Sequence, residues 1–121
     1  MTLAREELAA AELLLRSGHA RVAIARVYFA VFHTARARLF ASGLEPKTHA
    51  GVQHLFNVHF VRPGTYPPEH SQLLARLQKY REEADYAAAF AVDEAGAARE
   101  LEAARAFLDR VRAELATAPP A

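Results

Sequence analysis

The sequence predicts an all-α fold, a single-domain bundle of about five helices with a long central second helix. Its 121 residues include 28 alanines and 13 arginines, and both residue types lose little entropy on entering a helix. Apolar residues recur at helical spacing along most of the chain. Alternating segments typical of β-strands are absent from the sequence.

The first helix is predicted to begin with Thr2 as its N-cap and to stop at Ser17 and Gly18. One face of this helix is apolar, and it consists of Leu3, Leu8, Ala11 and Leu15.

The second helix is predicted over residues 19–42 and ends at Gly43, because glycine suits the position after a helix. Apolar side chains nearly encircle it, which is typical of a helix in the middle of a core. They are Val22, Ile24, Val27, Tyr28, Phe29, Val31, Phe32, Leu39 and Phe40. We expect Tyr28, Phe29 and Phe32 to be core residues rather than base-stacking platforms.

The third helix is predicted to follow Thr48 as its N-cap and to end before Pro63. After an extended segment that includes Tyr66, Pro68 suits the start of a fourth helix. The apolar residues of these two helices are Val52, Leu55, Phe56, Val58, Phe60, Leu73, Leu74, Leu77, Tyr80 and Ala84.

A fifth helix is predicted after a break near residues 85–93, with Asp93 as its N-cap. Its apolar seam is suited to packing on another helix, within the fold or in a second subunit. The seam consists of Ala97, Leu101, Ala104, Leu108, Val111 and Leu115. We therefore expect one helical domain over residues 1–116 and a flexible tail over residues 117–121.

Composition excludes several classes of function. With no cysteine there is no disulfide framework, no thiolate nucleophile and no cysteine-based zinc site. A net charge of +1 gives no overall attraction to nucleic acid or to anionic membranes, so such binding requires a local patch. No signal-peptide pattern and no apolar run of about 18 residues is present. We expect a soluble, cytoplasmic protein, and the bias toward alanine and arginine fits a GC-rich bacterial genome.

A metal site is not expected. His49, His54 and His59 are each five residues apart, so successive side chains turn by about 140° around a helix and diverge. No cofactor-binding motif is present in the sequence either.

Arg26 and His33 are the first candidate site residues, since seven residues place them on the same side of the second helix. In a functional interpretation Arg26 holds an anion and His33 moves a proton near neutral pH. In a structural one Arg26 pairs with an acidic residue such as Asp85, and His33 bonds to a backbone carbonyl.

Arg81, Asp85 and Tyr86 form a second group, in which Arg81 and Asp85 are neighbours at i, i+4. A catalytic role for Asp85 is one interpretation, and a structural network with Arg26 and the tyrosine hydroxyls is the other.

A third group surrounds the start of the third helix. Lys47, Thr48 and His49 place cationic and hydroxyl groups beside free backbone amides, which favours an anion site. Alternatively, Thr48 is simply a cap and Gly51 a position of close packing.

Three segments together resemble the HEPN family, the higher eukaryote and prokaryote nucleotide-binding domains. They are residues 25–36 (ARVYFAVFHTAR), residues 47–52 (KTHAGV) and residues 81–86 (REEADY), and they occur in the family's order. The resemblance covers most of the chain. It implies a bundle of about five helices, commonly dimeric, with a cleft where long helices of two subunits meet.

The family includes metal-independent ribonucleases, often toxins, and small proteins found beside a minimal nucleotidyltransferase. Its ribonucleases carry an arginine followed after four to six residues by histidine, late in the fold. Here Tyr86, Ala87 and Ala88 occupy that window after Arg81, whereas Arg26 and His33 have the spacing but lie early in the chain.

The resemblance therefore favours the partner-binding branch. It implies a homodimeric nucleotide- or phosphate-binding accessory module that works with a minimal nucleotidyltransferase in a toxin–antitoxin-like pair. Two alternatives stay open. One is a metal-independent ribonuclease that uses His33, with Arg26 or Arg81, and leaves a 2′,3′-cyclic phosphate. The other is a structural dimer without a ligand.

Overall fold

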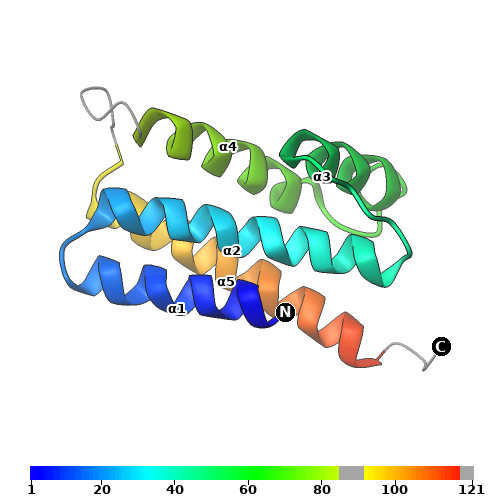
Figure 1. The fold of residues 1–121 in the computed structure, drawn as a ribbon, viewed down its shortest axis with the longest axis horizontal. Helices are drawn as coiled ribbons and strands as arrows, with labels where there is room; N and C mark the ends of the chain where they lie inside the picture. Colours follow the sequence, from blue (N-terminus) through cyan, green and yellow to red (C-terminus); the bar gives the residue numbers. More distant parts are fainter. Residues whose placement is uncertain (85–91, 118–121) are drawn as a thin grey trace.

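A computed structural model, which describes residues 1–84 and 92–117, confirms the all-α bundle (Figure 1). Within these ranges there are five α-helices, one π-helical segment and no strand. In chain order they are α1 (Thr2–Arg16), α2 (Ala20–Ala41), α3 (His49–Phe56), the π-helical η1 (Asn57–Val61), α4 (Pro68–Ala84) and α5 (Glu94–Thr117).

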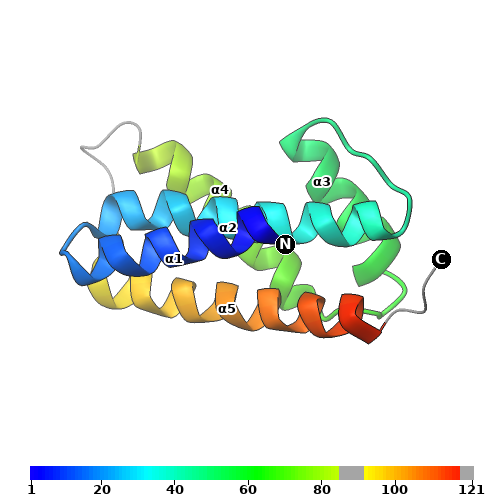
Figure 2. The same cartoon turned by 60° about the horizontal axis from the view of Figure 1, so that its bottom comes forward.

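Helices α1 and α2 form an antiparallel hairpin, and α5 runs along both of them (Figure 2). The hairpin turn depends on Gly18, whose φ of +81° is unfavourable for other residues. The end of α2 is built in the same way. Gly43 has a φ of +78° there, and the backbone N–H of Leu44 donates to the carbonyl of Leu39 at 2.9 Å. Both predicted helix ends are confirmed.

The predicted N-caps agree with the structure at two positions and differ at one. The hydroxyl of Thr48 accepts the N–H of Gly51 at 2.8 Å, and the carboxylate of Asp93 accepts the N–H of Gly96 at 2.7 Å. The prediction that Thr2 is a cap is wrong. Thr2 is the first residue of α1, and Met1 holds the N-cap position without a side-chain hydrogen bond. With helical backbone of its own, Thr2 is one residue too late to cap this helix.

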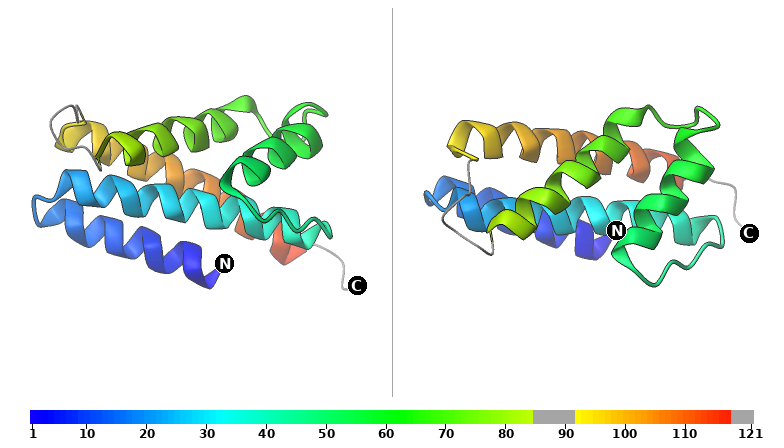
Figure 3. Two further views of the ribbon diagram at one scale, coloured as in Figure 1. Left: turned by 45° about the horizontal axis from the view of Figure 1, so that its top comes forward. Right: turned by 90° about the horizontal axis from the view of Figure 1, so that it is seen from above.

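Helix α2 is the centre of the bundle, because α1, α3, α4 and α5 all contact it. Figure 3 shows α4 and the start of α3 on the side of α2 that faces away from α1. Tyr28, Val27 and Leu39 are fully buried, as predicted. The expectation that apolar residues of α2 are buried throughout is wrong for Val22 and Phe40, which are 46% and 44% exposed. Both lie near the ends of α2, and Figure 1 shows that α2 continues past the start of α1.

The third predicted helix changes its winding after Phe56, where α3 continues as the π-helix η1. The buried hydroxyl of Ser71 on α4 donates to the side-chain oxygen of Asn57 at 2.5 Å, which fixes the start of this wider turn. Phe56 and Phe60 still point into the core, with their ring centroids 5.2 Å apart.

The predicted break near residues 85–93 falls mostly on residues 85–91, which lie outside the described residues. On either side, α4 ends at Ala84 and α5 begins at Glu94, next to its Asp93 cap. Thr117 still belongs to α5, and the rest of the predicted tail lies outside the described ranges. Among the helices described, none is long and apolar enough to cross a bilayer.

Candidate functional site

Four polar residues singled out in the sequence surround one aromatic ring, that of Phe29 on α2. The guanidinium carbons of Arg26 and Arg81 lie 4.9 and 5.5 Å from its centroid. The imidazole rings of His33 and His49 lie 6.3 and 6.4 Å from the same centroid. We call this group, with two more aromatic residues that contact it, the Phe29 cluster; it consists of Arg26, Tyr28, Phe29, Phe32, His33, His49 and Arg81.

Three helices bring the cluster together. Arg26, Phe29 and His33 are three and four residues apart, so they share one face of α2. His49 is the first residue of α3 and is held in place by the preceding cap. Arg81 comes from the last turn of α4. The site therefore lies where α3 and α4 both contact α2 (Figure 3).

His49 is fixed between aromatic residues of α2. Its ring stacks on Phe32 with centroids 4.3 Å apart, and its Nδ1 is hydrogen-bonded to the hydroxyl of Tyr28. Burial raises the pKa of Tyr28, so this hydroxyl keeps its proton. Burial, helped by the charge of Arg81, lowers the pKa of His49, so the imidazole is neutral at pH 7. When the Tyr28 hydroxyl donates to Nδ1, the imidazole carries its own proton on Nε2.

Arg81 lies against the aromatic rings of the cluster. Its guanidinium carbon lies 5.3 Å from the ring centroid of Tyr28. Its Nε is buried and has no hydrogen-bond partner among the residues described. Leaving a buried donor unsatisfied is costly, so such an atom needs a reason. Asp85 and Tyr86, which the sequence predicts beside Arg81, lie outside the described residues.

Arg26 is paired, and its partner comes from α1. Its Nη1 lies 3.2 and 3.1 Å from the two carboxylate oxygens of Glu7. The sequence suggested Asp85 as one such acidic residue. Glu7 is 19 positions away on another helix, so no spacing rule identifies it. Because Glu7 balances Arg26, Arg81 is the better placed of the two arginines for an incoming anion.

His33 lies at the edge of the cluster, with its ring centroid 5.4 Å from that of Phe32. Burial lowers its pKa, and the nearby Arg36 and His49 act in the same direction, while Glu7 opposes them. A neutral imidazole at pH 7 is suited to accept a proton.

The third predicted group is only partly in the cluster. Thr48 is a helix cap, and Lys47 is exposed. A Cβ on Gly51 would lie 2.9 Å from the Thr48 hydroxyl, so Gly51 is a position of close packing. Within residues 1–84 and 92–117, no three histidine or acidic side chains are placed to hold a metal ion.

Acid is expected to destabilise the fold through three half-buried histidines. Burial lowers the pKa of His33, His49 and His70 below the ordinary 6.5. As the pH falls below 6.5, these residues take up protons in the unfolded chain first, so the free energy of unfolding should fall. Urea titrations at several pH values measure this.

Two variants, each with one histidine replaced by glutamine, show whether the loss of stability in acid comes from protonation of histidines or of carboxylates. His70→Gln should reduce the loss between about pH 7 and pH 5, because the His70 ring stacks on Phe107 at 4.6 Å. His59→Gln should not, because His59 is exposed. Equal pH dependence in both variants would contradict the assignment.

Comparisons with known proteins match the chain over nearly its whole length. A family model described as the HEPN domain matches residues 1–114. A Methanocaldococcus jannaschii protein named "Putative toxin" is 34% identical over 93% of this chain and 84% of its own length. A Thermotoga maritima protein named UPF0332 is 33% identical over 89% of this chain and 82% of its own. Another protein of that name, from Pyrococcus horikoshii, is 44% identical over 51% of this chain and 44% of its own.

Proposed function

Because this chain belongs to the HEPN domain family, we propose that it is a toxin-like module that binds the phosphate of a nucleotide or of RNA at the Phe29 cluster. A single observation supports the choice of site: the buried Nε of Arg81 has no partner among the described residues. A phosphate oxygen accepts guanidinium N–H groups in forked geometry and would satisfy it.

The neighbouring side chains suit the same ligand. In the tautomer in which the Tyr28 hydroxyl donates to Nδ1 of His49, the imidazole carries its proton on Nε2 and donates it to a second phosphate oxygen. The guanidinium carbon of Arg81 lies 5.3 and 5.5 Å from the ring centroids of Tyr28 and Phe29, and its buried Nε reaches a phosphate oxygen only when the groups that cover it move. An anion beside His33 and His49 would raise the pKa of both and draw protons onto them.

The module is proposed to act in the cytoplasm as a homodimer of the 13.3 kDa chain, paired with a minimal nucleotidyltransferase as toxin and antitoxin. Two observations support this assembly. A relative similar over most of its length carries toxin in its name, and the sequence resembles small family members found beside such enzymes.

Purification of the tagged protein from a native lysate, followed by mass spectrometry, is expected to recover a small nucleotidyltransferase. Light scattering of the purified chain should give twice 13.3 kDa. A tagged protein of similar size serves as the control for adventitious recovery. Repeated recovery of this chain alone would contradict the partner proposal, and a monomeric mass would contradict the dimer.

Metal-independent RNA cleavage is a second candidate function. It is favoured by His33 and His49, whose pKa values are lowered and which lie around the ring of Phe29 together with Arg81. In this reaction His33 takes the proton of a ribose 2′-OH, and the oxygen attacks the adjacent phosphorus. The bond to the 5′ oxygen breaks, and that oxygen takes a proton from solvent water as it leaves, while the proton on His33 returns to solvent. The products are a 2′,3′-cyclic phosphate and a 5′-OH end. Arg81 would stabilise the charge that develops on the phosphate oxygens.

Labelled RNA incubated with the protein in EDTA tests this candidate. Wild type is expected to produce cyclic phosphate ends, and His33→Ala should slow cleavage by about 10²-fold or more. His59→Ala, which removes an exposed histidine from η1, is the matched control. Cleavage by His33→Ala at the wild-type rate would exclude His33 as the base. If the wild-type protein does not cleave RNA, the cleavage proposal is wrong and only the proposed phosphate-binding function is retained.

A further inference from the structure

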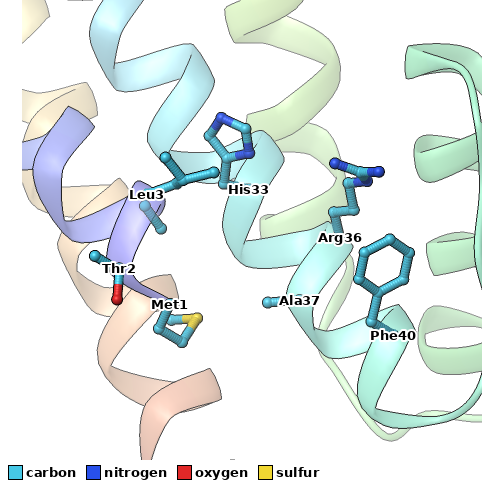
Figure 4. A pocket seen from close by; sticks show the side chains of 8 residues that line it. Met1, Thr2, Leu3, His33, Arg36, Ala37 and Phe40 are labelled. Carbon is cyan, nitrogen blue, oxygen red and sulfur yellow. The ribbon is translucent and has the colours of Figure 1, made fainter.

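A pocket between the start of α1 and the second half of α2 shares His33 with the Phe29 cluster (Figure 4). Its volume is about 260 Å³, slightly below the range of roughly 300–1,000 Å³ that is usual for drug-sized ligands. That size suits one flat ring system. The pocket is lined by Met1, Thr2, Leu3, Ala4, His33, Arg36, Ala37 and Phe40.

Two of the residues that line the pocket are large apolar side chains that the fold leaves exposed. Leu3 is 58% exposed and Phe40 is 44% exposed. In Figure 4, Met1 and Leu3 lie on one side, Phe40 and Arg36 on the other, and the small side chain of Ala37 lies between them. A flat ligand resting above Ala37 would therefore have apolar contacts on both faces.

The polar groups of the pocket select the charge of its ligand. The guanidinium carbon of Arg36 lies 4.7 Å from the ring centroid of Phe40, and His33 is at the end of the pocket next to the cluster. Among the residues that the structure describes, no aspartate or glutamate lines it. These donors suit an aromatic group that has acceptor atoms on its edge and an anion attached to it.

We infer that this pocket binds the nucleobase attached to the phosphate held at the Phe29 cluster, an inference that rests on the proposed function. His33 is the link between the two subsites, because its side chain lines the pocket and contacts Phe29 and Phe32. The base lies against Phe40 with its edge toward Arg36, while Arg81 and His49 hold the phosphate. The same base and phosphate occur in a free nucleotide and in single-stranded RNA.

Titrations with three probes test the inference: a 5′-mononucleotide, a short single-stranded RNA, and ribose 5-phosphate, which lacks a base. Phe40→Ala removes the aromatic wall, and Ala37→Leu fills the pocket. Each is expected to weaken binding of the mononucleotide or the RNA by about fivefold or more, the usual effect of losing one stacked base. Neither should change the affinity for ribose 5-phosphate. Val22→Ala, a loss of an equally exposed apolar residue on the same helix, should change none of them.

The outcomes separate the pocket from the proposed function. Unchanged mononucleotide and RNA affinities in both pocket variants, with weaker binding in Arg81→Ala, would overturn the base subsite and leave the phosphate site intact. Wild type that binds none of the three probes would overturn both. If the two pocket variants bind RNA more weakly but the mononucleotide with unchanged affinity, the inference is supported and RNA is the source of the base. If they weaken only binding of the mononucleotide, the source is a free nucleotide.

Discussion

Replacing Arg81 with alanine is expected to weaken binding of single-stranded RNA by about tenfold or more, the range for losing hydrogen bonds to a charged group. The physical reason is that the variant has no guanidinium to donate to the phosphate; among the described residues no hydrogen bond of Nε is lost, only the contacts with the rings of Tyr28 and Phe29. The fold should therefore tolerate the change. Fluorescence anisotropy with a labelled oligonucleotide measures the affinity, and circular dichroism measures the melting temperature.

Arg76→Ala is the matched control, because it removes an equal charge from the same helix. Arg76 is held by Glu100 on α5, with Nε 2.6 Å from the carboxylate. Arg81→Lys adds a further test, since it keeps the charge and loses the planar fork. A specific site predicts that Arg81→Ala and Arg81→Lys both weaken binding and that Arg76→Ala does not. Equal losses in Arg76→Ala and Arg81→Ala would mean that only net charge matters.

The second large effect concerns stability. Phe56→Ala should lower the free energy of unfolding by about 3–5 kcal/mol, the usual cost of truncating a buried phenylalanine. Phe56 is 1% exposed, and its ring centroid lies 5.2 Å from Tyr66 and 5.5 Å from Phe107. The cavity would open between α3, the connecting segment and α5. Urea unfolding followed by circular dichroism measures the loss.

Phe40→Ala provides the comparison for this prediction. The same chemical truncation is made at a side chain that is 44% exposed, so the loss should be well under half of that at Phe56. A similar loss in the two variants would contradict the burial assigned to Phe56.

Local signals explain why most of the fold could be predicted. Gly18 and Gly43 end helices through their positive φ, and Thr48 and Asp93 begin helices through side-chain hydrogen bonds to nearby amides. All four effects act within a few residues of chain. Thr2 fails as a cap because a one-residue shift of the helix start removes its geometry.

The candidate site was only partly predictable, because its contacts join separate helices. Helical spacing places Arg26 and His33 on one face of α2, but it cannot identify Glu7 on α1 or the contact of His49 with Tyr28. Those pairs depend on how each helix is rotated about its axis. The aromatic residues of α2 are evident in the sequence. Only the packing of α3 and α4 on α2 shows that the polar residues lie around the ring of Phe29.

Tyr66 shows the same limit for a loop. The sequence predicts an extended segment there and gives no sign that its ring is buried. In the structure Tyr66 is 1% exposed, and its hydroxyl donates to Glu114, which also accepts from Arg38 at 3.2 Å. Burial, together with the Glu114 carboxylate, raises the pKa of Tyr66 far above its ordinary value. This network fixes the segment before α4 to α5.

The most direct test of the central claim is to follow the Nε–H signal of Arg81 by nuclear magnetic resonance. The wild-type protein in EDTA is titrated with a short single-stranded RNA and then with a mononucleotide, and Arg81→Lys identifies the signal. Phosphate binding at the Phe29 cluster predicts a saturable shift of the Arg81 signal with at least one of the two ligands, while the Nε–H signal of Arg76 stays in place. An Arg81 signal that neither ligand moves would contradict the claim that phosphate binds at the Phe29 cluster.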